Sequence, residues 1–165
     1  RHFFQSLAES WEQAEKTQSQ VSIIMLDLDY FKLYNDFYGH QEGDRCLREI
    51  AQLFKSYIDK VGGKVARYGG EEFCIVLPDA DLETALRTAE RCRKNIESAD
   101  IQAGDEHIKL TASFGLATVT ADKINEPSAK LDSLLRQADK ALYKAKEQGR
   151  NCVVDYNSEM HKHAV

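Results

Sequence analysis

The sequence predicts an α+β fold in which a central, mostly antiparallel sheet is flanked by helices. Apolar residues recur at helical spacing in some segments and at strand spacing in others, and the two kinds of segment are mixed along the chain. No internal repeat, low-complexity stretch or proline-rich linker marks a boundary. Because 165 residues suffice for one domain with a buried core, we expect a single domain over residues 1–165.

Each element follows from the spacing of its apolar residues and from the glycines between segments. The expected elements, in chain order, are helix 3–16, strand 21–28, helix 42–58, a hairpin around Gly69 and Gly70, helix 82–97, strand 110–116, helix 130–147 and strand 152–154. The core order β, α, β, β, α, β is the ferredoxin-like arrangement. That arrangement predicts a sheet on one face of the domain and helices on the other.

Composition and charge argue against several classes of function. With 22 basic and 27 acidic residues the net charge is −5, so no overall positive field attracts nucleic acid. Three of the four cysteines fall in apolar patterns and none forms a CxxC pair, which is typical of buried thiols in a reducing compartment. The longest apolar run, VSIIML, is too short to span a bilayer. We therefore expect a cytoplasmic domain that contacts neither membrane nor nucleic acid.

Two carboxylates mark the end of the first predicted strand. In LDLDYF, Asp27 and Asp29 are two residues apart and project from one face of a strand, whereas Leu28 points into the core. Carboxylates in this position suit a hard cation such as Mg²⁺, which commonly keeps substrate phosphates among its ligands. An alternative for Asp29 is the N-cap of a short helix that begins at Tyr30.

The stretch RYGGEEF places two glycines and two adjacent carboxylates at the predicted hairpin turn. A turn alone needs neither, since Asn-Gly or Asp-Gly supplies the positive φ values of a two-residue loop. In an antiparallel sheet the first strand can lie beside this hairpin, so that Asp27 and Glu71 converge on one metal. Gly69 and Gly70 would then let the backbone and a nucleotide approach closely.

These segments together resemble a known family. RYGGEEF and DLDYFKLYNDFYGHQEGD are similar to the GGDEF domain of diguanylate cyclases in its GGEEF variant, and TASFGLA and ADKALYKAKEQGRN resemble later family segments in order and spacing. The resemblance implies condensation of two GTP molecules into cyclic di-GMP with loss of two pyrophosphates, on a sheet like that of nucleotidyl cyclases and polymerase palms. It also implies a homodimer in which each subunit holds one GTP.

Single positions acquire roles through this resemblance. Asp27, the backbone carbonyl of Leu28 and Glu71 are implied to bind two divalent ions, with Mg²⁺ as first choice and Mn²⁺ as the alternative. Two ions would neutralise triphosphate charge and activate the attacking 3′-hydroxyl. Glu71, or as second choice Glu72, is the candidate proton acceptor. Lys32 matches the position that stabilises the reacting phosphates.

The resemblance also implies a set of substrate contacts. Asn35 and Asp44 match the guanine-recognising positions, and their chemistry fits, because a carboxylate accepts from N1–H and the 2-amino group while an amide donates and accepts. The further implied contacts are Phe31, His40, Gly69, Gly70, Lys146 and Arg150. Structural alternatives remain open: a loop position for Asn35, a turn role for His40, and complementation of helix dipoles by Asp44, Lys146 and Arg150.

The sequence departs from the family pattern in two places. Family members carry a segment resembling DxLTGLxNRRxF, whereas this chain begins at RHFF, so we expect a piece of a longer protein with a sensor or receiver domain upstream. Many members also carry an inhibitory RxxD motif before the two glycines. Those four positions read Lys60, Val61, Gly62 and Gly63 here, so the arginine and the aspartate are both missing, and we expect weak product inhibition.

Three functions remain open at this stage. An active cyclase is favoured by the undamaged GGEEF stretch together with Asp27, Lys32, Asn35 and Asp44. A catalytically inactive GGDEF domain that serves as a nucleotide-binding regulatory module usually carries a damaged signature. A cyclase or polymerase-like enzyme that acts on another base would need different groups at the guanine positions.

Overall fold

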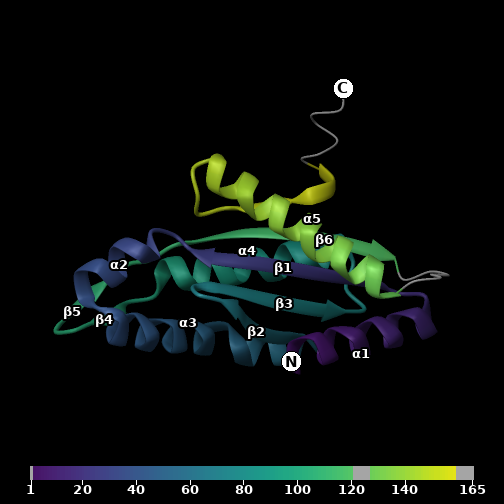
Figure 1. The fold of residues 1–165 in the computed structure, drawn as a ribbon, viewed down its shortest axis with the longest axis horizontal. Coiled ribbons are helices and arrows are strands. Elements are labelled where there is room, and N and C mark those ends of the chain that lie inside the picture. Colours follow the sequence, from purple (N-terminus) through teal and green to yellow (C-terminus); the bar gives the residue numbers. More distant parts are fainter. Residues whose placement is uncertain (1, 121–126, 159–165) are drawn as a thin grey trace.

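The computed structural model describes residues 2–120 and 127–158. A sheet lies between helices in this structure (Figure 1). The elements, in chain order, are α1 (His2–Thr17), β1 (Gln20–Leu28), α2 (Phe31–Tyr38), α3 (His40–Lys60), β2 (Lys64–Gly69), β3 (Glu72–Pro78), α4 (Leu82–Ser98), β4 (Ile101–Ala103), β5 (Glu106–Ile108), β6 (Ala112–Thr120), α5 (Pro127–Glu147) and β7 (Val153–Asp155).

The main sheet has five strands in the order β2-β3-β1-β6-β7. β1 lies at the centre and pairs antiparallel with β3 on one side and with β6 on the other. β2 is antiparallel to β3, and the pair β6 and β7 is parallel. The expected α+β class with a mostly antiparallel sheet is confirmed, and the strand that carries the predicted metal-binding carboxylate is the central one.

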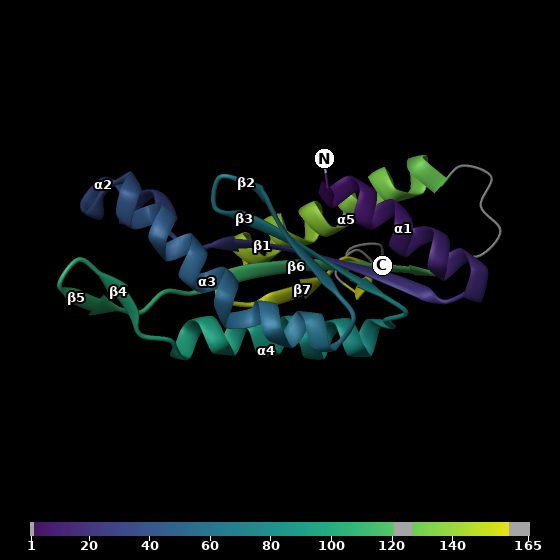
Figure 2. The same ribbon diagram turned by 90° about the horizontal axis from the view of Figure 1, so that it is seen from below.

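The central strand is buried on both faces. Ile24 and Leu26 pack into one apolar core with residues of α3 and α4, whereas Ile23 and Met25 pack into a second core with residues of α1 and α5. Figure 2 shows these two helix pairs on opposite sides of the sheet. The expectation of helices on one face only is therefore wrong. The run VSIIML is continuously apolar, which is the pattern of a strand that is covered on both sides.

Two parts of the structure lie where the periodicity assigns no element. The hairpin β4–β5 forms a separate two-stranded sheet, and its strands are three residues long, which is too short for a periodic signal. The helix α2 has eight residues and was indicated only as an alternative for Asp29. Both pack beside the first turns of α3, and Figure 1 shows α2, β4 and β5 together at one end of the molecule.

Two expectations from composition concern the thiols and the membrane. Cys46, Cys74 and Cys92 are buried, as their apolar surroundings predict, and no disulfide forms within the described part of the chain. Burial raises the pKa of Cys46 to about 12, so this thiol stays protonated near neutral pH. Among the helices that the structure describes, none combines the length and apolar character that a bilayer crossing requires.

Gly115 sets the distance between α5 and the sheet. It lies in β6, and a Cβ at this position would be 2.0 Å from the backbone nitrogen of Leu142 and 2.4 Å from the carbonyl oxygen of Ala138. Both atoms belong to the backbone of α5, which cannot turn aside as a flexible side chain can. Because α5 also carries Lys146, the missing side chain at Gly115 fixes the height of that lysine above the sheet.

We predict that Gly115→Ala destabilises the fold by about 1–3 kcal/mol, the usual cost of forcing extra atoms into a packed interior. The measurement is the free energy of unfolding in urea. Gly69→Ala is the matched control, because a Cβ at Gly69 meets nothing within 4 Å, and it should change stability by less than about 0.5 kcal/mol. Equal stability of the two variants would contradict the close approach of α5.

Candidate active site

The predicted site residues gather where β1 ends beside the hairpin of β2 and β3. In the register of the sheet, Asp27 on β1 lies directly opposite Glu72 on β3 and opposite Ser113 on β6. The expectation that the first strand adjoins the hairpin is therefore confirmed. Residues directly opposite each other project from the same face of a sheet, so Asp27 and Glu72 share the face that α5 covers.

Asp27 is a buried carboxylate, and only one of its two oxygens has a partner among the described residues. The residue is 6% exposed, and its Oδ2 forms an ion pair with Lys146, which comes from the last turn of α5. Its Oδ1 is buried and has no hydrogen-bond partner within the described residues. Burial raises the pKa of Asp27, and the ion pair with Lys146 offsets part of that rise. An unpaired buried oxygen of this kind is suited to a metal ligand.

The hairpin turn carries the other two carboxylates. Gly70 has φ 51°, which is the left-handed region that glycine tolerates, and a Cβ at Gly69 would meet open space. Glu71 and Glu72 are both half-buried. Burial raises the pKa of Glu72, and the neighbouring negative charge of Asp27 raises it further. The turn therefore brings negative charge next to Asp27 while its glycines leave space around the backbone.

Asp139 on α5 adds a further negative charge, and the sequence analysis missed it. It contributes to the raised pKa of Glu72, while Lys146 lowers that pKa. Asp139 and Lys146 are seven residues apart, which is two helical turns and places both on one face of α5. The seven-residue spacing between Asp139 and Lys146 is the sequence pattern that could have identified Asp139. Within residues 2–120 and 127–158, no group of three or more His, Cys, Asp or Glu side chains is assembled to hold a metal by itself.

Asp29 has a different role from Asp27. Its carboxylate accepts hydrogen bonds from Thr111 Oγ1 and Ser113 Oγ, both at 2.6 Å, and from the backbone N–H of Asn151 at 3.0 Å. The alternative that Asp29 caps a helix is wrong, because the N-cap position of α2 is Tyr30, without a side-chain cap bond. Asp29 instead joins the end of β1 to β6 and to the turn after α5.

That turn holds Arg150 beside the site. Arg150 and Asn151 have φ 66° and 47°, and Tyr30, which directly follows Asp29, has φ 58°. Non-glycine residues therefore adopt the left-handed conformation both next to Asp29 in the chain and in the turn that bonds to its carboxylate. Such residues need surrounding contacts to hold them there. The guanidinium of Arg150 lies over the Tyr30 ring, 4.8 Å from its centroid. The bond from Asn151 to Asp29 therefore fixes a strained turn that presents Arg150.

The predicted guanine positions lie on α2 and α3. The loop alternative for Asn35 is wrong, because Asn35 lies within α2. Its Oδ1 is buried and unpaired among the described residues, and a Cβ at Gly43 would be 1.8 Å from that oxygen. Gly43 thus makes the space that the amide occupies. Asp44 follows it on α3, is exposed, and lies 3.9 Å from the guanidinium of Arg67.

Three further predicted residues lie on α2 and at the start of α3. Lys32 is exposed on α2, and His40 is exposed at the first position of α3. Phe31 is 4% exposed and stacks on Tyr34 with ring centroids 5.5 Å apart. Phe31 is therefore a core residue that packs α2 against the rest of the domain.

We predict that Asp29→Asn destabilises the chain by about 1–3 kcal/mol, because the amide cannot satisfy three donors and leaves buried polar groups unpaired. Hydrogen exchange of the Asn151 amide should accelerate more than that of α4. Asp36→Asn, on the exposed side of α2, is the control and should change stability by less than about 0.5 kcal/mol. An unchanged Asn151 exchange rate would show that Asp29 does not hold the turn.

Comparison with known proteins identifies relatives along most of the chain. The family model "Diguanylate cyclase, GGDEF domain" matches residues 1–152. Diguanylate cyclase A of Treponema denticola is 42% identical over 133 residues, which are 81% of this chain and 34% of that protein. Diguanylate cyclase VdcA of Vibrio cholerae is 44% identical over 138 residues, which are 82% of this chain and 39% of that protein.

A solved structure supports the same relation. The GGDEF domain of DgcB from Caulobacter crescentus, determined in complex with c-di-GMP, matches with a TM-score of 0.81 and 30% identity, over 94% of this chain and 88% of that one. The chain spans 34% and 39% of the lengths of the two curated relatives described above. From the family model and these identities together, the chain belongs to the GGDEF family of diguanylate cyclase domains.

Proposed function

We propose that this chain is a diguanylate cyclase that condenses two GTP molecules into cyclic di-GMP and releases two pyrophosphates. The observation that carries the proposal is the buried, unpaired Oδ1 of Asp27, held beside the carboxylates of the hairpin. Leaving a buried polar atom without a partner costs free energy, so such an oxygen is typical of a ligand position. Family membership indicates the class of reaction.

The donor set fits divalent metal ions, which GGDEF diguanylate cyclases use. We assign Asp27, the carbonyl of Leu28 and Glu71 as ligands of two ions, with Mg²⁺ as first choice and Mn²⁺ as the alternative. Oxygen donors are those that these hard cations prefer. The described side chains form no complete ligand group, and triphosphate oxygens together with water would complete the coordination. Bound metal would neutralise triphosphate charge and favour ionisation of the attacking hydroxyl.

Three cations bind the triphosphate in this proposal. Lys146 pairs with Asp27, and its ammonium has three donors, so it can contact a phosphate oxygen while it keeps that bond. Arg150 is presented by the turn that Asp29 holds, and Lys32 is exposed on α2. Cations fixed in advance around the reacting phosphate stabilise the charge that develops during transfer.

In each bond-forming step the 3′-hydroxyl of one GTP attacks the α-phosphorus of the other, and pyrophosphate leaves. Glu71, with Glu72 as second choice, accepts the proton of that hydroxyl. Two such steps close the ring of the product. Because each site holds one GTP, two copies of the chain have to face each other, so a homodimer is part of the proposal.

Guanine is selected by Asn35 and Asp44. The carboxylate accepts from N1–H and the 2-amino group, and the amide accepts or donates at the base edge. Adenine lacks both of these donors, so it leaves the carboxylate of Asp44 unpaired. The remaining substrate contacts that we assign are His40, Gly69 and Gly70. An upstream sensor or receiver domain and weak product inhibition remain predictions.

The test is incubation with Mg²⁺ and either GTP or ATP, followed by identification of the products by mass. We expect cyclic di-GMP from GTP and no cyclic dinucleotide from ATP. Glu71→Gln keeps the size of the side chain and removes its charge, so turnover should fall at least ~100-fold as a metal ligand is lost. Circular dichroism should show an intact fold.

The control for this variant is Glu83→Gln, an exposed residue in the first turn of α4, which should keep the parent rate. A Glu71→Gln variant with near-normal turnover would sink the assignment of Glu71. Absence of cyclic di-GMP across Mg²⁺ and Mn²⁺ at high protein concentration would overturn the cyclase proposal as a whole.

The requirement for two facing subunits predicts a rate that depends on protein concentration. We expect the rate per subunit to rise with concentration across a dilution series, because the productive pair forms by association. The measurement is the initial rate at saturating GTP. Light scattering at the same protein concentrations gives the mass of the particle and so shows whether monomer or dimer is present. A rate per subunit that stays flat where only monomer is detected would contradict the homodimer.

A further inference from the structure

A guanidinium on α4 is held in place by two carboxylates of its own helix. Arg93 Nε donates to Oε2 of Glu90 at 3.0 Å, and Arg93 Nη2 donates to Oε1 of the same carboxylate at 2.5 Å. Arg93 Nη1 donates to Oε2 of Glu97 at 3.2 Å. The Arg93 side chain is 14% exposed. Because two bonds to one carboxylate fix the plane of a guanidinium, Arg93 has one defined orientation.

The same guanidinium contacts the turn that follows α5. Arg93 Nη1 donates to Oδ1 of Asn151 at 3.0 Å, and Nδ2 of Asn151 donates to Glu97. Residues of α4 therefore bind the side-chain amide of Asn151 at both its oxygen and its nitrogen. The bonds of Arg93 to Glu90 and Glu97 stay within α4, whereas the bond to Asn151 reaches another part of the fold. Figure 2 shows α4 and α5 on opposite sides of the sheet, so this bond joins the two helical layers.

The turn after α5 has a backbone conformation that needs support. Arg150 and Asn151 have φ 66° and 47°, a region that non-glycine residues occupy only where surrounding contacts hold them. The backbone N–H of Arg150 donates to the carbonyl oxygen of Ala145 at 3.0 Å, and that of Asn151 donates to Asp29 at 3.0 Å. These bonds hold the main chain of the turn. The contacts from α4 hold the Asn151 side chain.

A purely structural role, in which Arg93 only stabilises α4, is the alternative. The helix is already anchored in the core by Cys92 and Ile96, which are fully buried. Ion pairs three and four residues apart on one helix add little stability. The contribution of Arg93 that these features do not supply is its bond to Asn151, which directly follows Arg150.

We propose that Arg93 is a positioning residue for Arg150. Through Asn151 it keeps the turn in the conformation in which the Arg150 guanidinium lies over the Tyr30 ring, 4.8 Å from its centroid. Without this bond the turn can relax toward ordinary φ values, and Arg150 then loses its direction toward the phosphates. This role rests on the proposed function, in which Arg150 contacts the triphosphate.

The probe is 3′-deoxy-GTP with Mg²⁺, which lacks the attacking hydroxyl and so reports binding without turnover. Its dissociation constant is measured by isothermal titration calorimetry on the 165-residue chain. Arg150→Met should weaken binding roughly tenfold, the usual effect of losing a hydrogen bond to a charged group. Arg93→Met should weaken binding roughly fivefold in the parent chain. In the Arg150→Met background it should add less than about twofold, because it acts through Arg150.

The variant Asn151→Gly tests the same contact from the side of the turn. Glycine accepts φ 47° without the steric cost of a Cβ, so the change removes the amide and keeps the backbone bond to Asp29. It should weaken binding about as much as Arg93→Met does. The double variant Arg93→Met/Asn151→Gly should be no weaker than either single variant, since both remove one contact. Circular dichroism shows whether each variant folds.

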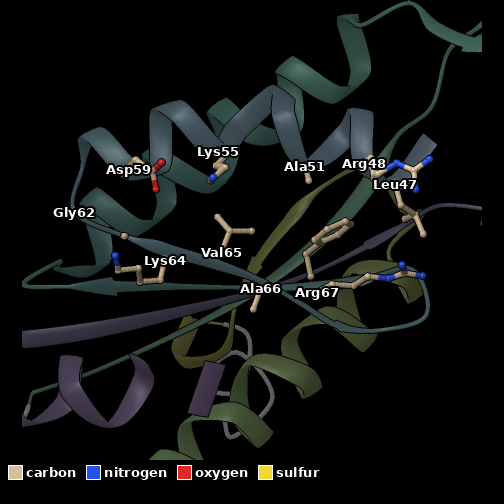
Figure 3. Close-up of a pocket in the computed structure, with 12 residues that line it drawn as sticks. Leu47, Arg48, Ala51, Lys55, Asp59, Gly62, Lys64, Val65, Ala66 and Arg67 are labelled. Carbon is tan, nitrogen blue, oxygen red and sulfur yellow. The ribbon is translucent and has the colours of Figure 1, made fainter. Parts of the chain in front are cut away.

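Two controls remove a positive charge elsewhere. Arg87 is exposed on α4, the helix that carries Arg93. Lys55 is exposed on α3 at the groove of about 690 Å³ between α3 and β2 (Figure 3), whose lining includes neither Arg93 nor Asn151. Because exposed charges are screened over such distances, Arg87→Met and Lys55→Met should each change the dissociation constant by less than about twofold.

Equal weakening by Arg93→Met in the parent chain and in the Arg150→Met background would show a general loss of structure and would refute the positioning role. Unchanged binding by Arg93→Met or by Arg150→Met would refute it as well, and so would a parent chain that does not bind the nucleotide. The cyclase proposal fails on a different result, the absence of cyclic di-GMP from GTP, even where nucleotide binding depends on Arg93 as expected.

Discussion

Burial of β1 on both faces is the constraint on which the rest of the structure depends. Successive side chains of a strand point to opposite faces, so Leu26 enters the core beneath α3 and α4 while Asp27 points toward α5. The carboxylate therefore meets Lys146 from α5 in a buried setting. On an open sheet the same pair would be solvated, and its attraction would contribute little.

The two aspartates at the end of β1 differ in the partners that compensate their buried charges. Asp29 is satisfied by two hydroxyl groups and one backbone N–H, so its buried charge is spread over neutral donors. Asp27 receives one cation and keeps an unpaired oxygen. Burying a charge is tolerated only with such compensation. The carboxylate of Asp29 thus joins the end of β1 to β6 and to the turn after α5. The carboxylate of Asp27 keeps an oxygen that can bind a ligand.

Local signals were enough for the fold class, the longer helices, the central strand and the hairpin, because periodicity and glycine position report the residues in their immediate surroundings. They could not reveal the partners of Asp29, since Ser113 and Asn151 are 84 and 122 residues away along the chain. Cover on both faces was readable in VSIIML, but the ferredoxin-like order predicted only one helical layer. Asp139 lay within the segment ADKALYKAKEQGRN, but only Lys146 and Arg150 of that segment were given roles, although the spacing of Asp139 from Lys146 was available.

The hairpin is shaped by a contact of the Arg67 side chain as well as by its own glycines. The register of β2 against β3 shifts between Arg67 and Gly69, which places an irregularity directly before the turn. The bond from Arg67 Nε to the carbonyl oxygen of Gly70 closes that irregular segment. β2 has one neighbouring strand in the sheet that the structure describes. The side chain of Arg67 therefore helps to set the positions of Glu71 and Glu72, which directly follow Gly70.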